Sequence, residues 1–259
     1  MKRLIVNADD LGISARRNAG ILEAHLRGIV TSSSLMARGP AGADALTRLK
    51  SAPGLDIGLH LNLSEGEPGL PGHKTLVDSS GRFLGKVEAR RRAREGLFDP
   101  SEIERETASQ IETLRAAGLA VSHLDGHQHL HLYGSVAEAV ARTAARLDVR
   151  WIRLPADTEE YRKLCPVAAG CFRQYGLASP DHFAGSALSG RLDFDSLIET
   201  IRGLHEGVTE LMVHPGLADT ADGFSGPDRE RELAALSDPR LRSLLLQAGV
   251  ELTSFAGLQ

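Results

Sequence analysis

The sequence predicts an α/β fold, a deformed (β/α) barrel of about seven parallel strands in a single domain that spans residues 1–259. Short apolar runs of strand length alternate with amphipathic stretches of helix length, and this order gives a parallel sheet with right-handed crossovers. Aromatic residues make up only 4% of the chain, so Leu, Ala, Val and Ile must build the core, as is usual where helices cover a parallel sheet. Seven strands favour a closed or nearly closed barrel, and no G-x-G-x-x-G motif follows the first strand, which removes the usual dinucleotide site.

The first half of the chain begins with an apolar run at residues 4–8, which predicts a buried strand. A helix over residues 15–27 follows, with Ser14 as its N-cap. Its expected apolar face carries Ile21, Leu22 and Leu26. The elements expected next are a strand at 29–36, a helix at 40–51 and a strand at 55–63.

A Gly/Pro-rich stretch at residues 66–72 and a basic run at 86–94 then interrupt the alternation. Residues 156–190 give no clear signal, and we expect loops and short helices there. The strands expected in this half lie at 120–125, 150–154, 210–214 and 250–255. The helices expected lie at 101–117, 135–147, 193–205, 227–236 and 239–247.

Composition excludes several classes of protein. A formal net charge of −4 argues against a nucleic-acid partner, since phosphate contacts need clustered Lys and Arg. The basic run at 86–94 is interleaved with glutamates and is interpreted as a solvated helix face or a flexible insertion, with a contact to an acidic ligand as the alternative. Two cysteines, Cys165 and Cys171, do not make a disulfide framework. With no signal-peptide pattern and no apolar run of membrane-spanning length, we expect a cytoplasmic protein.

Polar side chains stand at the ends of five predicted strands. In parallel barrels the carboxyl ends of the strands carry the active site, so these side chains are expected to meet at one mouth. They are Asn7, Asp9 and Asp10 after the first strand, His60 and Asn62 in the third, the segment His123–His131 after the fourth, Arg153 after the fifth, and His214 after the strand at 210–214.

The adjacent carboxylates Asp9 and Asp10 need a physical reason, because two ionised neighbours past a buried strand repel one another without a cation. A metal ion relieves this repulsion, since one carboxylate can ligate while the other acts as a base. The alternative is a turn or a helix N-terminus, where Asp is common. His60 lies in an otherwise apolar strand, and a hydrogen-bonded core histidine is its alternative interpretation.

Three histidines, His127, His129 and His131, stand at alternate positions, which would place them on one face of an extended segment. The spacing does not choose among them, and a solvated histidine-rich loop remains an alternative. One Asp and two His with open positions form a recognised arrangement for a catalytic metal. His214 suits a general acid that protonates a leaving nitrogen; a metal-ligating or structural histidine is the alternative.

Four segments together resemble the YdjC family, which contains chitooligosaccharide deacetylases and deacetylases associated with hopanoid biosynthesis. The resemblance runs from residue 3 to about residue 255. The segments are Leu-Ile-Val-Asn-Ala-Asp-Asp-Leu-Gly at 4–12, Gly-Leu-His at 58–60, His-Leu-Asp-Gly-His-Gln-His-Leu-His at 123–131, and Val-His-Pro at 213–215. Two departures are Leu11, where the family often has Phe, and Gly126-His127-Gln128, where it often has Ser-His-His.

The resemblance implies a deformed (β/α) barrel, one divalent metal ion (Mg²⁺ or Zn²⁺), and hydrolysis of N-acetyl groups on amino sugars. It assigns Asp10, His60 and His127 as metal ligands, Asp9 as the catalytic base and His214 as the acid. The chain is thus expected to act on an N-acetylated sugar, and a homodimer is compatible with this assignment.

Further residues are expected around these five. Asp125 and His129 are candidates for orienting the ligands through ring N–H groups. Arg153 is expected either to hold sugar hydroxyls or to stabilise Asp9. The full group of substrate-binding candidates is Arg153, Asn62, Glu65 and His182, the last because Asp181–Gly185 resembles a feature of the hopanoid-associated branch. Two rival functions remain: a metal-dependent barrel enzyme of another type, such as a sugar isomerase or phosphoesterase, and a non-catalytic sugar-binding protein.

Overall fold

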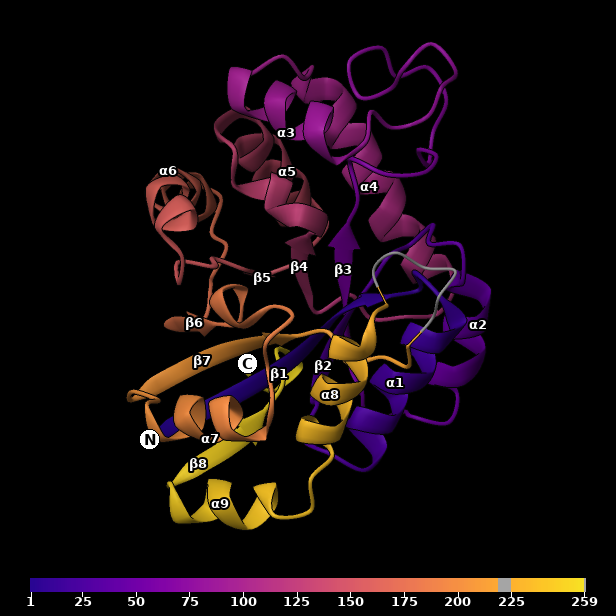
Figure 1. Cartoon of the computed structure of the whole chain (residues 1–259). Coiled ribbons are helices and arrows are strands. Elements are labelled where there is room, and N and C mark those ends of the chain that lie inside the picture. The colour runs from indigo at the N-terminus through magenta and orange to yellow at the C-terminus, as the bar shows by residue number, and fades with distance from the viewer. Residues whose placement is uncertain (219–224, 259) are drawn as a thin grey trace.

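One parallel sheet carries the strands of the computed structural model, which describes residues 1–218 and 225–258. The strands are β1 (Lys2–Leu11), β2 (Ser32–Leu35), β3 (Asp56–Leu61), β4 (His123–Gly126), β5 (Trp151–Ile152), β6 (His182–Ala184), β7 (Gly207–Val213) and β8 (Val250–Thr253). Their order is β5-β4-β3-β2-β1-β7-β6, with β8 paired to β1. The sheet curls into part of a barrel with helices around its outside (Figure 1), which confirms the predicted fold class and adds the short strand β6.

Strand β1 forms the centre of the sheet. It pairs with β7 along residues 2–8, with β8 along 2–5 and with β2 from Asn7 onward, all in parallel register. The strand is longer than the predicted run at 4–8 and includes Asp9 and Asp10. The β1–β2 register shifts between Ala8 and Leu11. The adjacent carboxylates therefore lie at the irregular end of a strand that is buried from Leu4 onward.

The helices begin where the sequence provides caps. Ser14 accepts from the backbone N–H of Arg17 at the start of α1, and Asp99 accepts from that of Ser101 at the start of α4. The helices are α1 (Ala15–Leu26), α2 (Gly42–Leu49), α3 (Lys86–Glu95), α4 (Pro100–Ala116), α5 (Gly134–Arg146), α6 (Glu159–Gln174), α7 (Phe194–Arg202), α8 (Pro227–Leu236) and α9 (Leu241–Gln247), with short 3₁₀ turns η1 (His127–Leu132), η2 (Ser186–Leu188) and η3 (Ala256–Leu258). The predicted helices are all present with ends shifted by a few residues, and the basic run forms α3, a solvated helix.

Two details of the prediction were wrong. Residues 156–190 contain the 16-residue helix α6 rather than loops and short helices. Pro166 lies inside this helix, and a proline there usually argues against a helix because it lacks the backbone N–H donor. The N-cap Thr158 is of a residue type that favours a helix start. On α1, Leu26 is 55% exposed rather than buried, because it is the last residue of the helix.

Two buried glutamates of α4 hold the long connection between β3 and α3. Glu106 accepts from the backbone N–H of Gly69 at 2.8 Å and lies 3.0 Å from Nε2 of His73. Glu102 accepts from the backbone N–H groups of Lys74 and Thr75 at 2.6 and 2.8 Å. A carboxylate that accepts several backbone N–H groups fixes a loop without regular structure, so this connection is held against α4. No helix among the described residues is long and apolar enough to cross a membrane.

The glycines at 20 and 170 form a matched pair inside helices α1 and α6. A Cβ on Gly20 would lie 2.4 Å from Cα of Gly216, whereas in the described structure a Cβ on Gly170 would meet no atom within 4 Å. We expect Gly20→Ala to lower the free energy of unfolding by about 1–3 kcal/mol through overpacking. Gly170→Ala should raise it by roughly 0.5–1 kcal/mol through helix propensity. Urea denaturation measures both values, and shifts of the same sign would contradict the close approach of α1 to Gly216.

Candidate active site

Three donor atoms meet at the carboxyl ends of β1, β3 and β4. Oδ1 of Asp10 lies 3.3 Å from Nε2 of His60 and 3.2 Å from Nδ1 of His127. The two histidine nitrogens are 3.2 Å apart. All three residues are buried. The structure thus brings together the three side chains that the resemblance implied as metal ligands.

The size of this triangle fits one divalent cation. Ligands about 2.1 Å from a common ion lie roughly 3.0–3.4 Å apart at octahedral or tetrahedral angles, and the three observed separations fall in that range. The described residues contain one further group of this kind, Asp9, His60 and Asp125. In that group Arg153 already bridges the two carboxylates, at 2.6 Å from Asp9 and 2.9 Å from Asp125. The Asp10–His60–His127 triangle, which we call the ligand triad, is therefore the better site for a cation.

Asp125 orients His60 within the triad. Burial opposes ionisation of Asp125, but Arg153 and His60 hold the pKa of this carboxyl well below its usual range. The carboxylate can only accept, so Nδ1–H of His60 must donate to its Oδ1, at 2.5 Å. Nε2 of His60 then faces the other two members of the triad. Asp125 thus stands where the sequence analysis expected it, behind a candidate ligand.

Glu65 lies behind His127. Its Oε2 is 3.7 Å from Nε2 of His127, and its Oε1 accepts from the side-chain amide of Gln128 at 2.6 Å. Gln128, one of the two departures from the family pattern, thereby holds the loop through Glu65. Glu65 was expected to bind substrate, but the structure places it beside a candidate metal ligand, where it can fix the orientation of the ring.

Arg153 forms a buried bidentate ion pair with Asp9. Its two terminal nitrogens donate to the two oxygens of Asp9, each at 2.6 Å, and its Nε donates to Glu210 at 2.8 Å. The guanidinium is fully buried. Of the two roles expected for Arg153, the structure supports the stabilisation of Asp9 and not a contact to sugar hydroxyls, because the side chain does not reach the surface.

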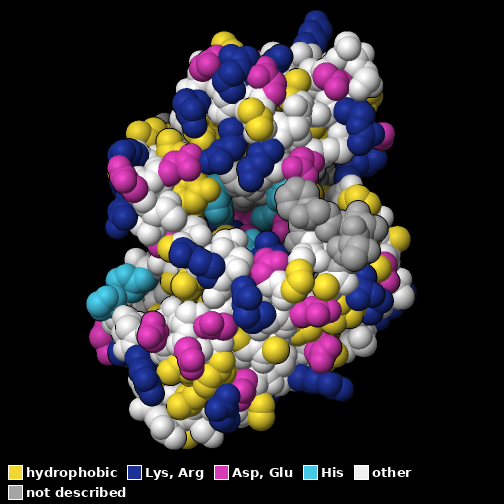
Figure 2. Space-filling view, viewed as in Figure 1, with side chains coloured by type: hydrophobic (Ala, Val, Ile, Leu, Met, Phe, Trp, Pro, Cys, Tyr) yellow, Lys and Arg dark blue, Asp and Glu magenta, His cyan; other side chains and the backbone are white. Residues whose placement is uncertain are grey.

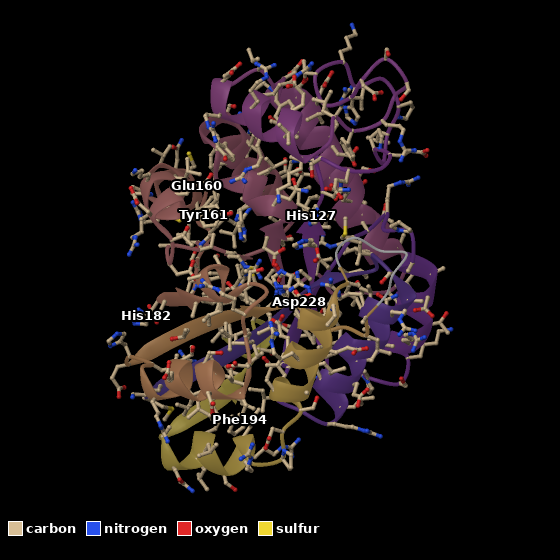
Figure 3. The ribbon with its side chains drawn as sticks, viewed as in Figure 1. His127, Glu160, Tyr161, His182, Phe194 and Asp228 are labelled. Carbon is tan, nitrogen blue, oxygen red and sulfur yellow. The ribbon has the colours of Figure 1, made fainter. Side chains whose placement is uncertain are left out.

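A pocket of about 400 Å³ opens over these residues, which is the size that small ligands need. Asp9, the ligand triad and His214 border it from the side of the sheet. The other residues that line it are Lys86, Gln128, His129, Thr158, Glu160, Tyr161, Ser186, Ser189, Met212 of β7 and Arg229 of α8. Figure 2 shows the pocket as a hollow with histidines at its base, and Figure 3 shows Glu160 and Tyr161 on the α6 side of it. A larger surface groove of about 660 Å³ lies between α7 and α9, away from the ligand triad.

His214 follows β7 and lines the pocket. Burial lowers the pKa of its imidazole to about 4, so the ring is neutral in the metal-free protein near pH 7. Its backbone N–H donates to Glu232 of α8 at 2.6 Å. Burial raises the pKa of Glu232 to about 7. A neutral ring at this position can take up a proton when negative charge develops beside it.

Alternate histidines after β4 do not share one face, contrary to the expectation for an extended segment. Gln128 and His129 have φ of 57°, in the left-handed region, within the 3₁₀ turn η1. His127 therefore faces the triad, whereas His129 lies against the ring of Tyr161, with 4.7 Å between ring centroids. His131 turns elsewhere and contacts the carbonyl of Arg153 at 3.1 Å. His129 is part of the pocket wall rather than a support for a metal ligand.

Two further expected residues lie outside the pocket wall. Asn62 holds its own turn, accepting from the backbone of Ser64 and donating to the carbonyl of Glu65 at 2.6 Å. His182 lies at the amino end of β6, opposite Thr209 near the start of β7, and its Nε2 contacts the carbonyl of Glu206. Figure 3 shows it at the edge of the molecule. Neither side chain lines the pocket: Asn62 follows the carboxyl end of β3 but is held in its own turn, and His182 stands at the amino end of β6.

Three buried polar residues beneath the site were not expected from the sequence. They are Arg17, Ser34 and Glu210, each at most 1% exposed. Arg17 gave a signal, because it stands four residues before Ile21 and so lies on the apolar face of α1. A charged residue on a buried face needs a partner of opposite charge, and Asp10 is that partner.

A profile of the YdjC-like protein family matches residues 3–247 of the chain. The chain belongs to the YdjC family. Among members of known name, it is 36% identical over 296 residues to a human carbohydrate deacetylase, covering 99% of this chain and 91% of the relative. It is also 36% identical over 255 residues to the carbohydrate deacetylase of Geobacillus stearothermophilus, covering 97% and 96%.

Several solved structures share the fold of this chain. A protein from Enterococcus faecalis, described as a cellobiose-phosphate cleavage protein, superimposes with a TM-score of 0.86 at 25% identity over 99% of this chain and 98% of its own. The lactam utilization protein from Thermus thermophilus superimposes with a TM-score of 0.58 at 20% identity over 98% of this chain and all of its own. This second likeness concerns the fold alone.

Cation binding to the triad should tighten as pH rises. Burial opposes the charged form of His60, but the negative charges of Asp125 and Asp10 outweigh it and raise its pKa to about 10. Near neutral pH the metal-free protein therefore holds a proton on His60 that a cation must displace. We expect the Zn²⁺ dissociation constant to fall at least about tenfold per pH unit between pH 6 and 8, measured by competition with a chelator. A constant that does not change with pH would contradict the protonated triad.

Proposed function

We propose that this chain is a metal-dependent hydrolase that removes N-acetyl groups from an amino sugar or from a glycan that contains one. The observation that carries the proposal is the position of Asp9, His214 and the ligand triad around one pocket. The names of the relatives, carbohydrate deacetylases at 36% identity over nearly the whole chain, support the same reaction and the same substrate class.

The cation fits the donor set of the triad. Two imidazole nitrogens and one carboxylate suit Zn²⁺ or another transition ion better than Mg²⁺, which prefers oxygen ligands. With three protein ligands, positions remain open for water and substrate. When bound there, such an ion supplies Lewis acidity toward the amide carbonyl and lowers the pKa of water.

Asp9 is the proposed base. It borders the pocket next to the triad, and Arg153 holds both of its oxygens in place. An ionised carboxylate in this position can take a proton from the attacking water as the new C–O bond forms. The bidentate contact fixes the direction of the carboxylate, so no rotamer search is needed before the proton moves.

His214 is the proposed acid. Its ring lines the pocket, is neutral at rest, and takes up a proton from solvent as negative charge develops on the amide carbonyl. It gives that proton to the nitrogen as the C–N bond breaks, and Asp9 releases to solvent the proton that it took from the water. The products are acetate and a free amino sugar.

We further infer that the sugar binds to five residues that line the pocket in and near α6, which we call the α6 wall: Thr158, Glu160, Tyr161, Ser186 and Ser189. Thr158, Ser186 and Ser189 offer hydroxyl groups to the pocket, Glu160 offers a carboxylate, and Tyr161 offers an aromatic ring. This mixture of hydrogen-bonding groups and one ring is what a polar ligand with apolar faces needs. These residues come from the part of the chain that gave no sequence signal, and they replace Asn62 and His182 as candidates.

Acetate release from N-acetylglucosamine and its oligosaccharides by the metal-loaded protein tests the reaction. Asp9→Asn should lower kcat by about 10²–10⁴-fold, the usual contribution of a general base, while cation binding persists. His60→Ala should lose cation binding and activity together. The matched controls are Asp195→Asn and His205→Ala, both at exposed positions, and both should retain activity. Equal acetate release from all five proteins would exclude the mechanism, and turnover of a sugar phosphate without acetate release would favour the phosphoesterase alternative.

The α6 wall is tested with tyrosine variants. Tyr161→Ala should raise KM for the acetylated sugar about tenfold, which corresponds to loss of roughly 1.4 kcal/mol of binding, with a smaller effect on kcat. Tyr175→Ala, at the C-cap of α6 and outside the pocket wall, is the control and should leave KM unchanged. If both variants had the same KM as the wild type, the sugar would have to bind elsewhere.

A further inference from the structure

The two oxygens of Asp10 have different partners. Oδ1 faces His60 and His127 at 3.3 and 3.2 Å. Oδ2 accepts from Nη1 of Arg17 at 3.2 Å. Arg17 is fully buried, and the Asp10 side chain is 9% exposed. One oxygen thus belongs to the ligand triad and the other to the helix.

The chain between the two residues fixes this division. Asp10 has φ of 67°, in the left-handed region that an aspartate tolerates better than most residues. Its carbonyl accepts from the backbone N–H of Ile13 at 3.2 Å, and Asn18 accepts from the backbone N–H of Gly12 at 2.7 Å. This tight turn brings the first turn of α1 back against the end of β1. Arg17 therefore reaches Asp10 from a rigid element.

We propose that Arg17 is a positioning residue that holds Oδ2 of Asp10, so that Asp10 binds the cation through Oδ1 alone. The inference rests on the cation site of the proposed function. A carboxylate can bind a metal ion through one oxygen or through both. If Oδ2 also turned to the ion, it would occupy a position that water or the substrate carbonyl needs. Arg17 keeps that position open.

The positive charge of Arg17 indicates that this residue does more than support the Asp10 side chain. The two histidine ligands are backed by acids, Asp125 and Glu65, whose negative charge favours a nearby cation. Arg17 carries a positive charge that repels one. A neutral donor could support Asp10 without that repulsion, so a buried guanidinium here has a use that outweighs its electrostatic cost. Competition with the cation for Oδ2 is such a use, because a fixed charge keeps hold of the oxygen after the cation binds.

Co²⁺ is the probe for the first experiment, because its visible absorption weakens as its coordination number rises. The metal-free wild type, Arg17→Gln, Arg17→Lys and the control Arg27→Gln are titrated with Co²⁺. Arg27 lies at the exposed end of the same helix and pairs only weakly with Glu23, at 3.3 Å. At full loading, Arg17→Gln should show about twofold lower molar absorption than the wild type, as expected for a higher coordination number. Arg17→Lys, which keeps a charged donor, should restore it, and Arg27→Gln should match the wild type. An unchanged spectrum for Arg17→Gln would overturn the proposal.

A crystal structure of the Co²⁺-loaded wild type is the second experiment, and it does not depend on whether a variant folds. We expect Oδ1 of Asp10 at ligand distance and Oδ2 still bound to Arg17. Both oxygens at ligand distance would overturn the proposal. Neither experiment reads acetate release, so a failed deacetylase assay leaves this result interpretable. A wild type that binds no Co²⁺ would instead refute the cation site and with it the proposed function.

Discussion

A single buried guanidinium joins the parts of the site. Arg153 follows β5 at one end of the strand order, and it binds Asp9 of β1, Asp125 of β4 and Glu210 of β7. It also lies 5.7 Å from the ring centroid of Phe183 on β6, at the other end. The strand pairing of the described residues leaves the barrel open between β5 and β6. Arg153 spans that opening from the inside with side-chain contacts, where a closed barrel would use backbone hydrogen bonds.

Burying these charged groups costs free energy of solvation, so the ion pairs of Arg153 are a poor source of fold stability. Each buried ion loses several kcal/mol of solvation, and pairing returns that energy only when the geometry is good. Three carboxylates share one positive charge here, and burial, opposed by Arg153, raises the pKa of Glu210 to about 7. The cluster connects through Asp125 to His60, so the position of Asp9 and the orientation of a candidate metal ligand depend on the same guanidinium. Such a cluster is explained by function better than by folding.

The sequence predicted the order of strands and helices because that order is written in local apolar patterns and caps. It also predicted that Asp and His side chains would meet at one mouth, since parallel strands end at one edge. It did not choose His127 over His129, because the choice depends on two left-handed residues inside η1. The roles of Glu65 and Arg153 depend on the curl of the sheet, which sets which side chains face each other across it. The sequence did not predict helix α6, because Pro166 inside it is unfavourable in a helix, although Thr158 is a suitable N-cap.

The left-handed pair Gln128–His129 has a consequence for inheritance and engineering of the site. Within five consecutive residues, His127 belongs to the ligand triad, His129 packs on Tyr161 in the pocket wall, and His131 contacts the backbone carbonyl of Arg153. One short segment therefore carries three histidines with different contacts, and its backbone conformation alone points them in different directions. A single substitution can alter one of these contacts. Grafting the site onto another barrel must transfer the whole segment, because a regular extended backbone would place all three rings on one face.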